Sequence, residues 1–180
     1  MDIMKPLEFH FKDDGIIPNN TLPLLLYKQA FTLRGNEAGD WIKKHFASNN
    51  WTNSWRWGIY PFHHYHSNTH EVLALLSGQA LLHLGGEQGI KKQVESGDVL
   101  VIPAGVGHKC LSYSADFVVL GAYPNGIKPD LIREVKSARP KVDSNIEHVS
   151  LPDKDPLMGK NGGLTNIWHL VNEPLHENKV

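Results

Sequence analysis

Four side chains in this sequence have the chemistry and the spacing of a set of metal ligands. They are three histidines and one glutamate, held in two short glycine-containing segments: His64, His66, Glu71 and His108. Imidazole nitrogens with one carboxylate suit a divalent first-row metal such as Fe, Mn, Ni, Cu or Zn, whereas Ca and Mg prefer oxygen ligands. The pattern therefore predicts a metal centre and leaves the chemistry of that metal open.

Strand geometry explains how the first three of these residues could converge. Side chains alternate between the two faces of a strand, so His64 and His66 point the same way. The polar residues after them permit a turn, and Glu71 then returns on the next strand. Leu73 and Leu75 share the face of Glu71, and we expect that face to continue into the core.

The fourth residue, His108, comes from a separate part of the chain. It follows a bend at Pro103 and Gly105, and we expect it to cross a barrel to meet the other three. Four protein ligands on an octahedral ion leave positions open for water, substrate or dioxygen, and open positions distinguish a reactive site from a closed structural one.

Two other interpretations of the same residues stay open. A His-x-His pair on a strand can be ordinary surface or core histidine, and a bound metal can serve only to stabilise the fold. His63 and His70 flank the proposed ligands, but alternation directs them away, toward outer hydrogen bonds or solvent. Either could still orient a ligand from outside. Cys110, two residues after His108, is expected to be a small buried hydrophobe.

The elements that must position these residues lie between residues 51 and 123. Short apolar or alternating runs separated by glycine turns predict an antiparallel sandwich or barrel. The expected strands cover residues 55–60, 71–76, 79–84, 99–102 and 117–123.

One helix is expected before this region, at residues 36–50. Asn36 is its predicted N-cap, residues 49–50 its stop, and its apolar face should cover one side of the barrel. The residues of that face recur at helical spacing: Ala38, Trp41, Ile42, His45 and Phe46.

The two ends of the chain are expected to be less regular. Residues 1–35 predict an arm with short strands, among them residues 24–27. Residues 124–180 predict an irregular extension with a helical turn near 130–135. An apolar cluster should hold this extension against the barrel or a second subunit: Leu164, Ile167, Trp168 and Leu170. The whole chain, residues 1–180, is thus expected to be one domain.

Several side chains near the ligands allow two interpretations. Five aromatic residues could line a pocket or form plain core, and the core is favoured: Trp55, Trp57, Tyr60, Phe62 and Tyr113. Arg56 could stack on its tryptophan neighbours or bind an anionic ligand, but an outward salt bridge is the favoured interpretation.

Composition excludes several classes of protein. The chain of 180 residues is 41% hydrophobic and 21% charged, with a net charge of −1, so no basic field indicates nucleic-acid binding. The single cysteine excludes an intramolecular disulfide framework. The N-terminus lacks the features of a signal peptide, and no apolar run is long enough to cross a membrane, so we expect a cytoplasmic protein.

With these residues identified, the chain resembles the cupin superfamily. Residues Gly58, His64, His66, Glu71 and Gly78 match the first cupin motif. Residues Gly97, Pro103, Gly105 and His108 match the second, which often ends in asparagine where this chain has Ser112. More narrowly, residues 14–20, 55–60 and 63–67 are similar to the uncharacterised YjlB-type cupins, small single-domain bacterial proteins, over much of residues 10–125.

The resemblance implies an all-β fold, an antiparallel jelly-roll barrel with Fe, Mn, Ni or Zn bound inside it. It does not imply one reaction, because function is not a property of the fold. The expected function is that of a small-molecule enzyme of dioxygenase or isomerase type. The alternatives are a small-molecule binding or sensing module and a metal-stabilised structural protein. Small cupins also resemble one another in pairing through barrel edges and N-terminal arms, so a homodimer is expected.

Overall fold

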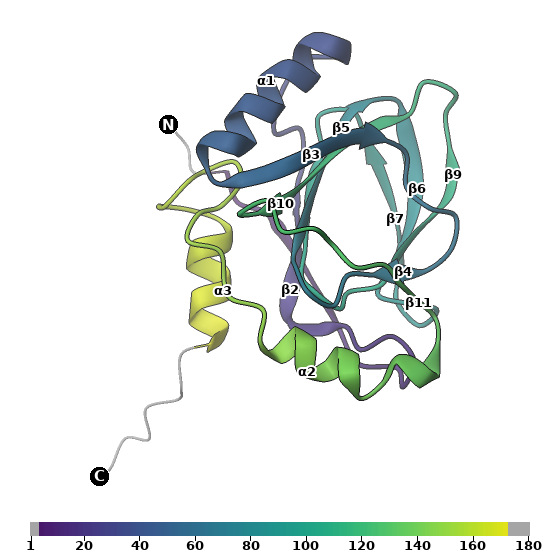
Figure 1. The fold of residues 1–180 in the computed structure, drawn as a ribbon. Coiled ribbons are helices and arrows are strands. Elements are labelled where there is room, and N and C mark those ends of the chain that lie inside the picture. Colours follow the sequence, from purple (N-terminus) through teal and green to yellow (C-terminus); the bar gives the residue numbers. More distant parts are fainter. Residues whose placement is uncertain (1–3, 173–180) are drawn as a thin grey trace.

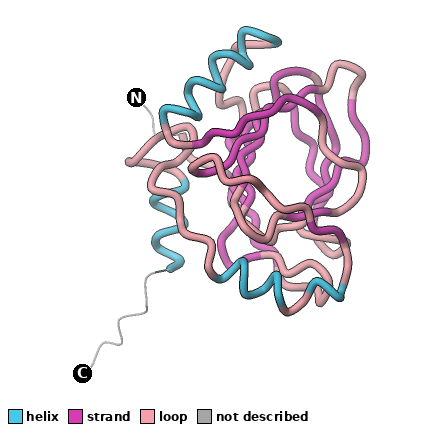
Figure 2. The backbone as a smooth tube through the Cα atoms, viewed as in Figure 1, coloured by secondary structure: helices cyan, strands magenta, loops and turns pink. Residues whose placement is uncertain are grey.

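The computed structural model describes residues 4–172, which form two antiparallel sheets. The six-stranded sheet has the order β1-β2-β8-β5-β10-β3, and the five-stranded sheet has the order β11-β4-β9-β6-β7 (Figure 1). The strands surround a common interior, with the helices outside it (Figure 2). The prediction of an antiparallel jelly-roll fold is confirmed.

The strands of the six-stranded sheet are β1 (Leu7–Phe11), β2 (Asn20–Tyr27), β3 (Trp51–Trp57), β5 (Glu71–Ser77), β8 (Val99–Ile102) and β10 (Val118–Pro124). Those of the five-stranded sheet are β4 (His64–Tyr65), β6 (Gln79–Leu84), β7 (Ile90–Glu95), β9 (His108–Tyr113) and β11 (Ile132–Arg133). The helices are α1 (Gly35–Ser48), the 3₁₀ turn η1 (Lys136–Ala138), α2 (Lys141–Glu147) and α3 (Leu164–Asn172).

The predicted strands agree best with the structure where the sequence is most apolar. The strands expected at 79–84 and 99–102 have the bounds of β6 and β8, whereas β3 begins and ends earlier than the expected 55–60. Strands β7 and β9 were not predicted. Both carry lysine and other polar side chains, and β7 is an edge strand whose residues are mostly exposed or half-buried.

Helix α1 confirms the predicted helix but differs in its cap and its face. Its N-cap is Arg34, without a side-chain hydrogen bond, and not Asn36. Ile42 and Phe46 are buried, but Trp41 is 41% exposed and stacks on the imidazole of His45 at 4.9 Å between ring centroids. The buried side of α1 is therefore narrower than the sequence pattern indicated.

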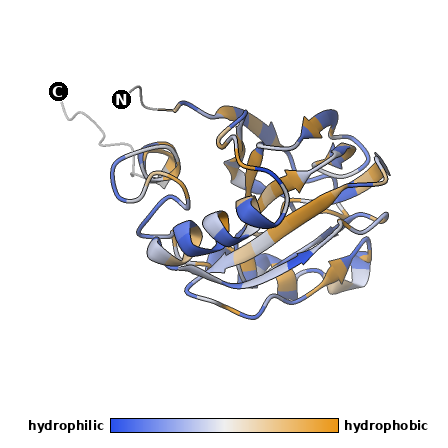
Figure 3. Cartoon of the chain, turned by 90° about the horizontal axis from the view of Figure 1, so that it is seen from above, coloured by the Kyte–Doolittle hydropathy of each residue, from blue (hydrophilic) through white to orange (hydrophobic). Residues whose placement is uncertain are grey.

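Strand β5 separates two apolar layers and so sets the direction of Glu71. Val72 and Ala74 belong to the cluster that also contains residues of α1 and α3. Leu73 and Leu75 belong to the cluster between the two sheets, as predicted from alternation. Hydrophobic residues concentrate on the strands (Figure 3). Glu71 has the parity of Leu73 and Leu75 and therefore faces the interior.

The C-terminal extension is more ordered than predicted. The helical turn expected at residues 130–135 is wrong, because Ile132 and Arg133 form β11, which pairs with β4. Leu164 and Trp168 of α3 are fully buried against the six-stranded sheet, which confirms contact with the barrel, whereas Leu170 is 69% exposed.

The N-terminal segment pairs within its own chain. Residues 24–27, predicted as a strand, lie in β2, which pairs with β8 on one side and with β1 on the other. Residues 1–3 and 173–180, which belong to the predicted arm and extension, lie outside the described residues. Within residues 4–172, no helix has the length and apolar character needed to cross a membrane.

Candidate metal centre

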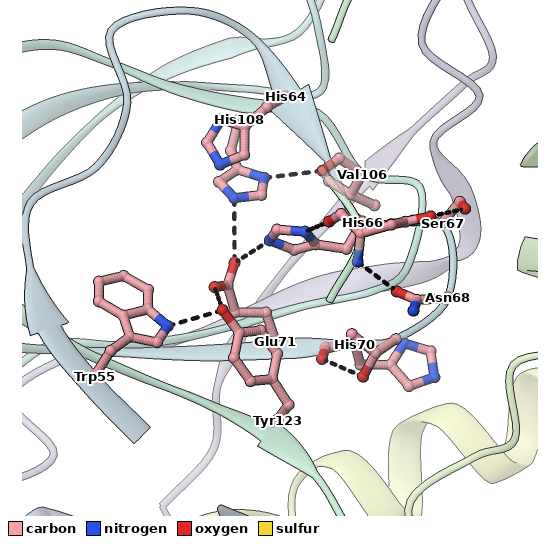
Figure 4. A network of polar contacts seen from close by, with 12 residues as sticks. Trp55, His64, His66, Ser67, Asn68, His70, Glu71, Val106, His108 and Tyr123 are labelled. Carbon is pink, nitrogen blue, oxygen red and sulfur yellow. Dashed lines mark hydrogen bonds and ion pairs between the residues drawn. The ribbon is translucent and has the colours of Figure 1, made fainter. Parts of the chain in front are cut away.

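The four predicted ligands converge from both sheets, on the inner side of the fold (Figure 4). His64 lies on β4, His66 follows this strand directly, and His108 begins β9. His64 and His108 are paired neighbours in one sheet, so the expectation that His108 crosses the barrel is wrong. The ligand that comes from the opposite sheet is Glu71, at the start of β5.

A turn before β9 fixes the second part of the site. The Gly105 N–H donates a hydrogen bond to the His66 carbonyl oxygen at 2.8 Å, which joins the turn directly to the first motif. Gly105 has a φ of +86°, and a Cβ there would lie 2.5 Å from the Asn19 carbonyl oxygen. Only glycine combines this backbone conformation with that close approach.

The ligand atoms are close together and shielded from solvent. One nitrogen from each of His64, His66 and His108 lies within 4.8 Å of the other two. Glu71 Oε2 lies 3.2 Å from His66 Nε2 and 3.2 Å from His108 Nε2. All four residues are buried, with at most 8% of any of them exposed.

Backbone carbonyls define which nitrogen of each ring faces the site. His64 Nδ1 lies 3.2 Å from the Phe62 oxygen, His108 Nδ1 lies 3.0 Å from the Val106 oxygen, and His66 Nδ1 contacts the Asp130 oxygen. A carbonyl oxygen only accepts hydrogen bonds, so each Nδ1 carries the proton and donates. In the neutral tautomer each Nε2 therefore has a free lone pair, as in metal-ligating histidines.

The three Nε2 atoms and the Glu71 carboxylate need a cation between them. Nε2 lone pairs and an ionised carboxylate are all hydrogen-bond acceptors, so they cannot form hydrogen bonds with one another. Glu71 Oε2 is buried and has no hydrogen-bond partner within the described part of the chain. An unsatisfied buried charge is costly, and a divalent metal ion would satisfy all four groups at once. The residues present therefore fit a divalent transition metal, the kind of ion that the resemblance to cupins implies.

The pKa values show how strongly these groups interact. Burial, and then the neighbouring imidazole of His108, lower the pKa of His64 to about 2, so His64 is neutral at neutral pH. Burial opposes ionisation of Glu71, but His66 and His108 together outweigh it, through their charges and hydrogen bonds, and hold the pKa of Glu71 well below its usual range. Burial lowers the pKa of His66, but Glu71 and Asp130 together outweigh burial, and the net shift of the pKa is upward. Glu71 therefore favours the protonated form of His66, and a bound metal ion would take the place of that proton at Nε2.

Two residues that the sequence pattern did not indicate orient the ligands. The Tyr123 hydroxyl donates to Glu71 Oε1 at 3.1 Å and accepts from Trp55 Nε1 at 2.8 Å. The carbonyl of Asp130 holds His66, and its carboxylate accepts from the Ser67 N–H at 2.7 Å. Neither lies in the ligand motif, and no signal in the sequence identified them.

A cavity of about 320 Å³ opens beside the four ligands. Its walls include Trp55, Trp57 and Tyr60, three of the five aromatic residues considered from the sequence. Phe62 lies outside this lining and packs under the guanidinium of Arg133, 3.8 Å from its ring centroid. Tyr113 is 69% exposed, away from the cavity. The remaining lining residues are Gly58, Ile59, Leu73, Tyr123, Pro129, Asp130 and Leu131.

The other residues considered near the site lie away from it. His70 Nδ1 accepts the Ala104 N–H at 2.9 Å, outside the cavity. His63 faces the outside of the sheet, where its Nε2 lies 3.1 Å from Glu87. Arg56 forms the favoured salt bridge, at 2.6 Å to Asp40. Cys110 is buried among apolar residues, and burial raises the pKa of its thiol, which fits the predicted structural role.

Comparisons with known proteins agree with this architecture. A model described as a cupin domain matches residues 58–120, the segment that contains all four ligands. The uncharacterized protein YjlB of Bacillus subtilis strain 168 is 44% identical over 161 residues, which cover 89% of this chain and 94% of YjlB.

Solved structures match over smaller regions. Acireductone dioxygenase from Bacillus anthracis, solved with a cadmium ion in its active center, has a TM-score of 0.41 and 16% identity, covering 59% of this chain and 82% of that one. A DMSP lyase from Ruegeria pomeroyi has a TM-score of 0.37 and 21% identity, covering 44% of this chain and 40% of that one. The domain match and the extensive similarity to YjlB show that this chain belongs to the cupin superfamily, as a YjlB-type member.

Proposed function

We propose that this protein is a metal-dependent enzyme, of dioxygenase or isomerase type, that acts on a small organic molecule. The observation that carries this proposal is the meeting of three Nε2 lone pairs and one carboxylate at the wall of a cavity. His64, His66, Glu71 and His108 would hold a divalent transition metal, such as Fe, Mn, Ni or Zn.

The position of the ligands supports catalysis more than a purely structural role. A structural site is usually closed by protein ligands, whereas these four residues form one side of a space large enough for a second molecule. A bound divalent ion would act as a Lewis acid toward a carbonyl or hydroxyl oxygen, or offer a binding position for dioxygen.

The walls of the cavity restrict the substrate. A volume of about 320 Å³ lies at the lower end of the range for ligand pockets, which favours a small molecule. Trp55, Ile59 and Leu73 give the walls an apolar character that would exclude water around the reacting group. The expected substrate therefore combines a compact apolar part with an oxygen group that can reach the four ligands.

The decisive experiment measures metal and turnover in one preparation. Protein from unsupplemented cells is analysed for its elements, then assayed with small acids, sugars and diketones for product formation and dioxygen uptake. We expect close to one equivalent of a first-row metal in the interior centre and turnover of at least one compound. His64→Ala should lose both, whereas His10→Ala, at an exposed position on β1, should keep both.

Two results would contradict the enzyme proposal. A small molecule that co-purifies in the cavity and is never converted, with any of the four metals, would favour a binding or sensing module. Metal that raises the melting temperature without turnover, with a coordination shell closed to solvent in a crystal structure, would favour the structural role.

A further inference from the structure

A second group of potential ligands lies on the outer face of the five-stranded sheet. It consists of His63, His83 and Glu87. His63 directly precedes β4 and points away from the interior ligand His64. His83 lies on β6 between Leu82 and Leu84, which both pack inside, so alternation places it outside. Glu87 follows in the turn between β6 and β7.

The three side chains are brought together by the fold and not by the sequence. One potential ligand atom from each lies within 4.8 Å of the other two. His63 Nε2 is 3.1 Å from Glu87 Oε1, and the rings of His63 and His83 lie 4.8 Å apart. The set of two imidazoles and one carboxylate is a ligand combination that first-row transition metals accept.

His63 provides a separate indication that something is bound here. Its side chain is 0% exposed, yet neither ring nitrogen has a hydrogen-bond partner within residues 4–172. Buried polar atoms are nearly always satisfied, and each exception needs an explanation. The ring is held close to Glu87 without a directed hydrogen bond, which is the arrangement expected when both groups are to donate lone pairs to one ion.

Two lysines near this cluster oppose a cation. Lys109 on β9 lies opposite His83 on β6 in the strand register. Its Nζ lies 2.5 Å from Glu87 Oε1. On the other side of β6, Lys91 on β7 lies opposite His83 in the strand register. An ion would therefore share Glu87 with the Lys109 ammonium or displace it. The side chain of Glu87 is 61% exposed, which leaves its carboxylate free to turn toward an ion.

We propose that His63, His83 and Glu87 form a second site, for a divalent transition metal such as zinc, outside the interior centre. Three protein ligands leave the fourth tetrahedral position to water. The ion would tie the segment before β4 to the β6–β7 turn, so its binding would add to the stability of the fold.

The test counts zinc ions bound by the complete chain. Isothermal titration calorimetry with Zn²⁺ is carried out on the natural sequence, on His83→Ala and on His10→Ala, which removes an exposed histidine distant in the sequence. We expect His83→Ala to bind one equivalent fewer than the other two proteins. Equal counts for all three would overturn the proposal. The test compares the zinc equivalents bound by the three proteins. If the interior centre binds no zinc, the count falls equally in all three, and the difference for His83→Ala remains.

Two milder variants keep the proposal testable if His83→Ala does not fold. Glu87→Gln keeps the size of an exposed side chain and should weaken zinc binding at the outer site by about tenfold or more. Glu37→Gln, at an exposed position on α1, should not change it. Lys109→Met removes the competing ammonium and should tighten binding. If neither Glu87→Gln nor Lys109→Met changes the zinc isotherm, Glu87 serves only as the salt-bridge partner of Lys109, and the proposal fails.

Discussion

The tautomers of three imidazoles decide which ring nitrogens of the interior site can bind a metal ion. Carbonyl oxygens of Phe62, Val106 and Asp130 each accept a hydrogen bond from an Nδ1, so each Nε2 is left to face the site. The Nε2 atoms of His66 and His108 both lie 3.2 Å from Glu71 Oε2. The sequence supplied the candidate ligands through their spacing. It could not supply the tautomers, because these depend on carbonyls that come from three different segments.

Tyr123 is predicted to support metal binding without contacting the ion. Burial, and then the charge of Glu71, raise the pKa of the Tyr123 hydroxyl above its usual range, so it remains a donor to Oε1. Tyr123→Phe should weaken the interior metal affinity by about tenfold or more, because outer hydrogen bonds orient the ligands. Metal titration with a competing chelator measures this change.

Tyr113→Phe is the matched control for Tyr123→Phe. Its hydroxyl belongs to a side chain that is 69% exposed and lies outside the cavity. It should leave metal affinity unchanged, and an equal loss in both variants would show that Tyr123 has no specific role.

At the scale of elements, the pairing of β4 with β9 builds the site. This pairing places His64 beside His108, whereas the expected path across the barrel would have separated them. The turn before β9 controls the register between β4 and β9, since the Gly105 N–H is hydrogen-bonded to the His66 carbonyl oxygen. Periodicity predicted the apolar strands β6 and β8 well. It could not predict β7 and β9, because their outward side chains are polar and interrupt the hydrophobic pattern.

A substitution in this turn should damage both stability and metal binding. Gly105→Ala adds a Cβ 2.5 Å from the Asn19 carbonyl oxygen at a positive φ, and we expect it to lower the free energy of unfolding by about 3 kcal/mol. Urea unfolding measures this loss, and metal titration of the folded variant should show weaker binding.

Gly15→Ala separates conformational strain from the steric clash. Gly15 has a φ of +88°, close to that of Gly105, but apart from its chain neighbours no group among residues 4–172 lies within 4 Å of the point that an alanine Cβ would occupy there. It should cost only about 1 kcal/mol, the strain of the backbone conformation alone. If the two alanine variants are equally stable, contact with Asn19 does not explain the glycine at position 105.

For the whole molecule, the C-terminal helix completes one of the two apolar layers. Trp168 is fully buried, donates from Nε1 to the Pro23 carbonyl oxygen at 2.9 Å and packs on His70 at 4.8 Å between ring centroids. His70 directly precedes the candidate ligand Glu71, so α3 packs behind the candidate metal centre, on the far side of its sheet. The apolar cluster predicted this contact, but nothing in its spacing indicated that Leu170 would face solvent.

Truncation of Trp168 should test this support. Trp168→Ala is expected to cost about 3–5 kcal/mol in the free energy of unfolding, through lost burial and the cavity left behind. Leu170→Ala, at a side chain that is 69% exposed, should change it by no more than about 0.5 kcal/mol. Thermal and urea unfolding measure both, and similar values for the two variants would place α3 outside the cooperative core.

The homodimer remains a prediction about the whole molecule. Strands β1 and β3 are the edges of the six-stranded sheet, and an edge strand offers unpaired backbone groups to a second copy. Multi-angle light scattering of the complete chain should give twice the mass of one chain at micromolar concentration. A single-chain mass at that concentration would refute the prediction.

The sequence by itself determined what is local: the candidate ligands, the shared face of His64 and His66, the parity of Glu71 with Leu73, and the opposite direction of His63. These follow from alternation along a strand, which needs no knowledge of distant residues. Only the tertiary structure decided that His108 pairs beside His64, that Tyr123 and Asp130 orient the ligands, and that His83 and Glu87 meet His63 on the outer face. The reason is physical: strand pairing and packing join residues far apart in the chain, and a local pattern does not specify which ones.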